Sequence, residues 1–114
     1  MLEHEIQEAV VNFLNIKYPG VLYCASAGGM RTSMRQAIKM KRTGYKKGFP
    51  DMQIMHPTKD YCGLFIEIKT HKGQASPEQK EWRDRLKERG YQAHICKGLD
   101  ACLKVIVDYM DETA

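Results

Sequence analysis

The chain has 114 residues, of which 43% are hydrophobic and 28% are charged, and its net charge is +4. That size and composition favour one globular domain over residues 1–114. No apolar run approaches the roughly 18 residues that would cross a membrane, and the acidic N-terminus lacks the layout of a signal peptide, so we expect a cytoplasmic protein. The four cysteines form no Cys-x-x-Cys pair. Zinc ligation and a disulfide framework are therefore not indicated, and we expect reduced, mostly buried thiols.

The apolar residues recur at helical or strand spacing in eight segments. Ser76-Pro77 followed by Gln79 is a strong helix start, since it combines an N-cap, a first-turn proline and a capping box. The predicted elements in chain order are helix 3–16, strand 21–25, helix 31–43, strand 52–55, strand 64–69, a helix from Pro77 that stops at Gly90, strand 91–96 and helix 99–110. With a hairpin between its second and third strands, this order predicts an α/β domain with a small mixed β-sheet flanked by helices.

The basic residues are unevenly placed along the chain. No Asp or Glu lies between Glu8 and Asp51. A one-sided basic stretch suits a polyanionic partner, because phosphate contacts release condensed counterions. A solvated helix face without special purpose is the alternative. The candidate DNA-binding residues in this stretch are Arg31, Arg35, Lys39, Lys41, Arg42, Lys46 and Lys47.

Charged residues inside an apolar strand are the strongest functional signal. Glu67 and Lys69 share one face of strand 64–69, since strand side chains alternate. Such charges are seldom tolerated in a core strand unless they are paired or hold a metal. The predicted hairpin would bring Asp51 beside them. Asp51 and Glu67 could then bind Mg²⁺ or Mn²⁺, and Lys69 could orient a water or contact a phosphate, as phosphodiester hydrolysis needs. Taken singly, Asp51 can be an ordinary residue after proline, and Glu67–Lys69 an ordinary salt bridge.

Three further side chains stay open from the residues alone. Glu3 shares the apolar face of the first helix and could add a metal ligand, although a first-turn glutamate favoured by the helix dipole is the simpler explanation. Gln79 could reach the site from the face it shares with Trp82, although capping with Ser76 is simpler. His71 could approach a phosphate, although a loop histidine is usually solvated.

Pro50-Asp51 followed by Glu67-Ile68-Lys69 resembles the signature of the PD-(D/E)xK nucleases. Within that superfamily, nearly the whole chain resembles a stand-alone VRR-Nuc domain, a virus-type replication-repair nuclease. The matching elements are Glu3-His4-Glu5-Ile6-Gln7, Ser26-Ala27-Gly28-Gly29, Gly44 through Asp51, Gly63 through Lys69, Ser76 through Trp82, Gly90-Tyr91 and the closing helix.

The resemblance implies a restriction-endonuclease-like core and cleavage of structured DNA that depends on Mg²⁺ or Mn²⁺. For Glu3 it favours the ligand over the helix-dipole explanation. Small stand-alone relatives, mainly from phages and bacteria, resemble Holliday junction resolvases and act as homodimers. The site residues it implies are Asp51, Glu67, the carbonyl of Ile68 and Glu3 as metal ligands, Lys69 as the catalytic lysine and Gln79 beside them.

The leading hypothesis is therefore a metal-dependent, structure-selective DNA endonuclease, a homodimer that nicks Holliday junctions or other branched DNA. A non-catalytic nucleic-acid-binding module that kept the fold is one alternative. It predicts salt-sensitive binding without metal dependence. A nicking endonuclease that acts on ordinary duplex DNA is the other, and a comparison of substrates separates it from the first.

Overall fold

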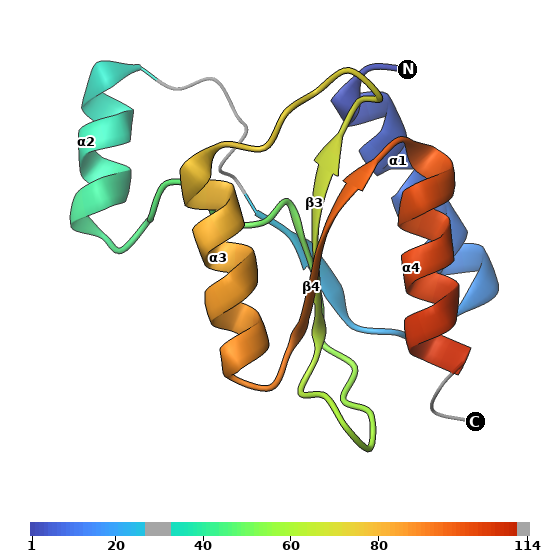
Figure 1. Cartoon of the computed structure of the whole chain (residues 1–114). Coiled ribbons are helices and arrows are strands. Elements are labelled where there is room, and N and C mark those ends of the chain that lie inside the picture. The colour runs from blue at the N-terminus through green and yellow to red at the C-terminus, as the bar shows by residue number, and fades with distance from the viewer. Residues whose placement is uncertain (27–32, 112–114) are drawn as a thin grey trace.

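The computed structural model describes residues 1–26 and 33–111. Its helices and strands follow the predicted order throughout (Figure 1). The first two strands are each three residues long, shorter than predicted, and the start of predicted helix 31–43 lies outside the described residues. The elements are α1 (Glu3–Lys17), β1 (Tyr23–Ala25), α2 (Met34–Arg42), β2 (Met52–Ile54), β3 (Leu64–Lys69), α3 (Pro77–Glu88), β4 (Gln92–Lys97) and α4 (Leu99–Asp111).

The four strands form one mixed sheet in the order β1-β2-β3-β4. The β1–β2 and β2–β3 pairs are antiparallel, and the β3–β4 pair is parallel. This topology confirms the predicted hairpin and the predicted mixed sheet. In the hairpin, Met52 lies opposite Ile66. Asp51 directly precedes Met52, so the same register brings it level with Glu67.

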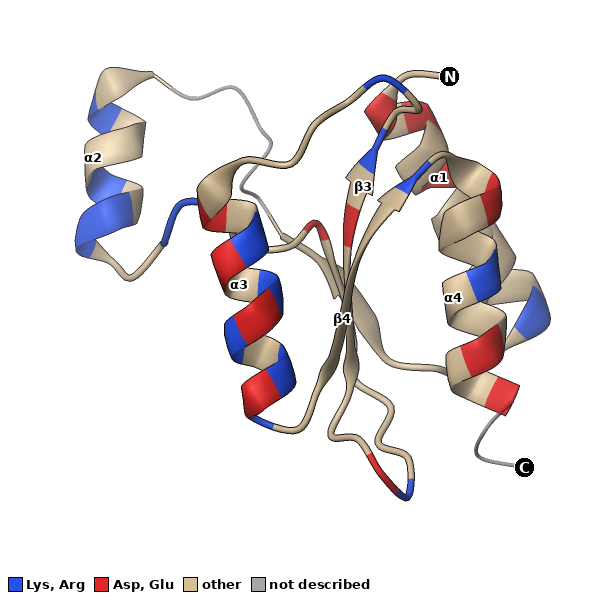
Figure 2. Ribbon diagram, in the orientation of Figure 1, with Lys and Arg blue, Asp and Glu red and all other residues tan. Residues whose placement is uncertain are grey.

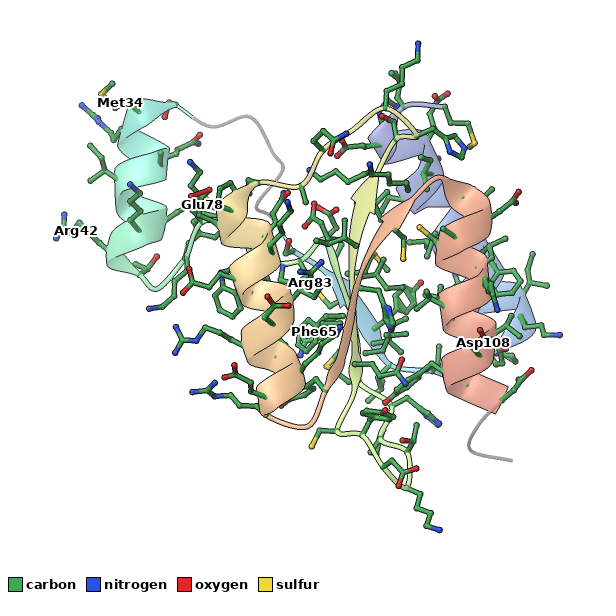
Figure 3. The ribbon with its side chains drawn as sticks, in the orientation of Figure 1. Met34, Arg42, Phe65, Glu78, Arg83 and Asp108 are labelled. Atoms are coloured by element: carbon green, nitrogen blue, oxygen red, sulfur yellow. The ribbon has the colours of Figure 1, made fainter. Side chains whose placement is uncertain are left out.

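Helices cover both faces of the sheet (Figure 1). α1 and α4 pack on one face and α3 on the other. Ile66 and Ile68 belong to the core under α1 and α4, whereas Phe65 belongs to a smaller cluster under α3 (Figure 3). Because strand side chains alternate, Glu67 and Lys69 lie on the α3 side with Phe65. The candidate site is therefore built on the less heavily covered face.

α2 stands apart from the three packed layers (Figure 1). Its start is well defined, because the Ser33 hydroxyl accepts a hydrogen bond from the backbone N–H of Gln36. None of its residues is buried. Met34 is 82% exposed and Ile38 is 53% exposed. The predicted helix is present, but its apolar residues face solvent rather than a core.

The described chain contains four free cysteines. Cys96 and Cys102 are buried, whereas Cys24 and Cys62 are exposed, so the prediction of mostly buried thiols is wrong for half of them. Cys24 lies on an edge strand and Cys62 in the loop before β3, where little covers them. No helix among residues 1–26 and 33–111 combines the length and apolar character needed to cross a membrane.

Candidate active site

The two predicted carboxylates meet across the β2–β3 hairpin. Asp51 Oδ2 accepts a hydrogen bond of 2.7 Å from the backbone N–H of Ile68. This bond holds the Asp51 side chain beside Glu67. Glu67 is 5% exposed and is the one charged residue that is buried in the described part of the chain. A buried acid next to a second acid is unfavourable on its own, and a cation bound to both would relieve the repulsion.

Two donors approach the same oxygen of Glu67. Lys69 Nζ lies 3.6 Å from Glu67 Oε2, and the two side chains are only 12% and 7% exposed. Gln79 Nε2 donates a hydrogen bond of 3.1 Å to that oxygen. Glu67 Oε1 is buried and has no hydrogen-bond partner among the described residues. A buried carboxylate oxygen without a donor marks the point at which an ion or water would bind.

Gln79 plays both of the roles that were left open. Its Oε1 accepts a hydrogen bond of 2.9 Å from the backbone N–H of Ser76 and completes the capping box of α3. The other end of the same amide donates to Glu67. Because the cap holds the amide oxygen, the amide nitrogen is directed at the site.

Burial controls the electrostatics of the acidic pair. The pKa of Glu67 is raised from 4.5 to about 8. Burial makes the largest contribution, followed by the close approach of the Asp51 carboxylate, and Glu3 adds a smaller rise. Lys69 lowers the pKa but does not cancel the rise. Without a cation, Glu67 therefore holds a proton at neutral pH.

This shift predicts how pH affects the stability of the metal-free protein. Between about pH 4.5 and 8 the folded state keeps a proton that the unfolded chain has released, so the free energy of unfolding should fall as pH rises through this window. Glu67→Gln should remove that contribution. Denaturation in EDTA at about pH 5, 7 and 9 measures the difference between wild type and variant.

The matched control is Glu88→Gln, the same chemical change on the exposed surface of α3. Its difference from wild type should stay constant over the pH series. A constant difference for Glu67→Gln as well would contradict the raised pKa.

Glu3 does not complete a cluster of three carboxylates. It is the first residue of α1 and is exposed, so although helical spacing puts it on the face of Ile6, it is not buried in the core. The buried face of α1 begins one turn later, at Ile6. Among the described residues, no three His, Cys, Asp or Glu side chains are close enough to hold a metal ion. Glu3 still acts on the site through its charge, since it raises the pKa of Glu67.

The remaining donor set suits a hard divalent cation. Mg²⁺ typically takes one or two carboxylates and keeps several of its waters. Asp51, Glu67 and the carbonyl of Ile68 offer oxygens of this kind. A cation there would give Glu67 Oε1 the partner it lacks and would favour the ionised form of Glu67. The residues present therefore fit Mg²⁺ or Mn²⁺.

Ser26 is a polar neighbour of the pair that the residue patterns did not single out. Its backbone N–H donates to the carbonyl of Asp51 at 2.8 Å. Its hydroxyl oxygen is buried and has no partner among the described residues. In the sequence it is one of several loop residues after a strand, and only the pairing of β1 with β2 shows that it lies beside Asp51.

The predicted DNA-binding residues lie on α2 and on the loop that leads to Asp51. α2 carries basic and no acidic side chains (Figure 2). Arg31 lies outside the described residues. The described members are all exposed, namely Arg35, Lys39, Lys41, Arg42, Lys46 and Lys47. His71 is also exposed, and its ring packs over Gly98, where an added Cβ would lie 2.5 Å from the imidazole.

Comparisons with known proteins show the family of the chain. The family model of the VRR-NUC domain matches residues 4–100. A solved structure described as a VRR_NUC domain protein is 32% identical, with a TM-score of 0.82 over 97% of this chain and 89% of that chain. A second, described as a VRR_NUC domain, is 19% identical, with a TM-score of 0.59 over 94% and 96% of the two chains, and supports the fold alone. No curated protein matches the chain.

Fold and family match together place the chain among nuclease-type domains. More particularly, it belongs to the VRR-NUC domain family, as the sequence resemblance predicted.

Proposed function

We propose that this protein is a metal-dependent, structure-selective DNA endonuclease that hydrolyses phosphodiester bonds in branched DNA, including four-way junctions. The observation that carries the proposal is the buried Glu67, set between Asp51 and Lys69 with one carboxylate oxygen unpartnered. Membership of a nuclease family supports the reaction class. The exposed basic residues before Asp51 support a nucleic-acid substrate.

Asp51, Glu67 and the carbonyl of Ile68 would hold Mg²⁺ or Mn²⁺, with Glu3 at the rim. When bound, the ion would supply an activated water and offset the negative charge that develops on the phosphate. Gln79 donates to Glu67 Oε2 and so leaves Oε1 as the free oxygen. The Ile68 N–H fixes Asp51 in the same way, since it occupies Oδ2 and leaves Oδ1.

Lys69 supplies the positive charge that the chain itself contributes. Its side chain is only 12% exposed, so the charge is partly shielded from solvent and acts more strongly on nearby groups than a surface charge would. From its position beside Glu67, it would orient the attacking water or contact the scissile phosphate.

Metal binding should be visible without any substrate. Adding Mg²⁺ or Mn²⁺ to the metal-free protein should raise its Tm, by an amount equivalent to about 2.7 kcal/mol when the ion is at 100 times its Kd. Binding should also release protons near neutral pH, because a ligand carboxylate must be ionised. Thermal melts and calorimetric titration in two buffers of different ionisation enthalpy measure both effects. Glu67→Gln should lose the proton release. Unchanged melting of the wild type in millimolar Mg²⁺ and Mn²⁺, with no heat of binding, would contradict the site.

The substrate part of the proposal rests on the basic surface. Cations on α2 and on the loop after it would contact phosphates without reading sequence, and Arg31 is proposed to join them. Such contacts favour recognition by shape. A two-fold homodimer would present two sites to a symmetric branched substrate.

A labelled four-way junction incubated with Mg²⁺ tests the function directly. We expect paired nicks, and weaker cleavage of blunt duplex and of single strands of the same length. Equal nicking of the duplex would favour an ordinary nicking endonuclease. Salt-sensitive binding with no cleavage of any substrate would favour the non-catalytic module and would contradict the proposed endonuclease function.

A further inference from the structure

A groove of about 390 Å³ runs along one face of α3, and neither Asp51 nor Glu67 lines it. One face of α3, from Glu78 to the C-cap residue Arg89, forms its floor. At 1.5 Å per residue this face is roughly 16 Å long. Lys46 and Lys47, from the loop that follows α2, form the other side. The groove is therefore long and shallow, a shape that suits a strand.

Trp82 lies in the groove as a fixed aromatic ring. It is the single tryptophan of the chain. Its Nε1 donates a hydrogen bond of 3.1 Å to the carbonyl of Lys47. Its ring meets Phe49 edge to face, with centroids 5.0 Å apart and an interplanar angle of 85°. The residue is only half-buried and still lines the groove. An aromatic side chain held in this way is a stacking platform for an unpaired base.

Positive charge is in excess around this ring. Four cations and two carboxylates line the groove. Glu78 lies 3.8 Å from Lys47, and Glu81 lies 3.8 Å from Arg85, so each carboxylate is matched by a neighbouring cation. Lys46 and Arg89 stand beyond those two pairs, at opposite ends of the groove. A combination of separated cations with an aromatic ring is typical of surfaces that bind single-stranded nucleic acid.

The groove is joined to the acidic pair by the loop before Asp51. Gly48 packs closely against the first turn of α3, since an added Cβ would lie 2.7 Å from the Cβ of Glu78. The next residue of α3, Gln79, donates to Glu67. A strand lying in the groove would thus pass the first turn of α3 at the end nearest the catalytic carboxylates.

We propose that this groove binds an unpaired segment of the DNA substrate, with a base stacked on Trp82 and phosphates on the flanking cations. The identity of the nucleic acid rests on the proposed nuclease function. Duplex DNA offers the groove its phosphates but not the face of a base. The groove therefore favours DNA with a segment that is unpaired at the branch point over DNA that is an unbroken duplex.

The fluorescence of Trp82 reports on this groove directly. The intact chain in EDTA is titrated with a thymidine 12-mer and, separately, with a blunt hairpin duplex. We expect saturable quenching by the single strand, weakened by salt, and little quenching by the duplex. Arg85→Gln/Arg89→Gln should weaken binding and reduce the salt slope by about 0.7 for each cation removed. The matched control, Lys17→Gln/Lys59→Gln, removes two exposed cations elsewhere and should bind like the wild type.

Circular dichroism establishes that each variant is folded. Absence of quenching, an equal response to duplex, or a groove variant that binds like the control would each overturn the inference. Because no metal is present, the result is independent of cleavage. If the single strand quenches Trp82 fluorescence in the wild type but no DNA is cleaved in Mg²⁺, only the nuclease proposal is contradicted. If DNA is cleaved but the fluorescence is not quenched, only the groove proposal is contradicted.

Discussion

Asp51→Asn should lower the rate of Mg²⁺-dependent junction cleavage by at least about a thousandfold, equivalent to roughly 4 kcal/mol of transition-state stabilisation. The substitution keeps the size of the side chain and an oxygen that can accept the hydrogen bond from the Ile68 N–H. It removes the negative charge that a divalent cation needs. Single-turnover rates on a labelled four-way junction measure the loss.

Asp60→Asn is the matched control, because it makes the same change on an exposed turn residue of the β2–β3 hairpin. It should cleave at the wild-type rate. Junction binding by Asp51→Asn in EDTA should also be retained, since the basic surface is untouched. Cleavage by Asp51→Asn within tenfold of the wild-type rate would show that this carboxylate is not a metal ligand.

Gly48→Ala should destabilise the protein by about 3 kcal/mol, and Gly20→Ala by only about 1 kcal/mol. The two glycines have nearly the same backbone angle, with φ of +89° and +88°, so a Cβ costs each of them similar backbone strain. They differ in their surroundings. At Gly48 the Cβ would lie 2.7 Å from Glu78 Cβ and 2.8 Å from its backbone carbonyl carbon, whereas at Gly20 it meets nothing within 4 Å.

Urea denaturation of the two variants isolates the packing of the loop against α3. Because the clash involves the backbone of α3, a rotamer change cannot relieve it. The folded fraction of Gly48→Ala should also cleave more slowly, since Gln79 follows Glu78 directly. Equal destabilisation by the two substitutions would show that the loop can move away from α3 at little cost.

The centre of the site could be predicted from the sequence because its signals are local. Strand β3 has the predicted bounds, since Glu67 and Lys69 interrupt an otherwise apolar run at a spacing that fixes their shared face. α3 begins where its capping box places it. The hairpin follows from the turn residues that separate two apolar runs, in the loop of residues 55–63, and it alone brings Asp51 to Glu67.

Features that depend on packing between distant segments were not visible in the sequence. Helical spacing puts Glu3 on the face of Ile6. It does not show whether the core extends as far as the first turn of α1. Local preferences made capping and site contact look like alternatives for Gln79, although the amide has two ends. The raised pKa of Glu67 needs the burial and the neighbours that only the folded chain provides.

Ile68 contributes to two parts of the molecule through different atoms. Its side chain is 1% exposed and packs in the core under α1 and α4, while its N–H holds Asp51. Every residue except proline carries the same main-chain N–H and carbonyl. Another apolar side chain could therefore replace this one, and the core beneath the candidate site could repack, without changing the main-chain groups that the site receives from this position.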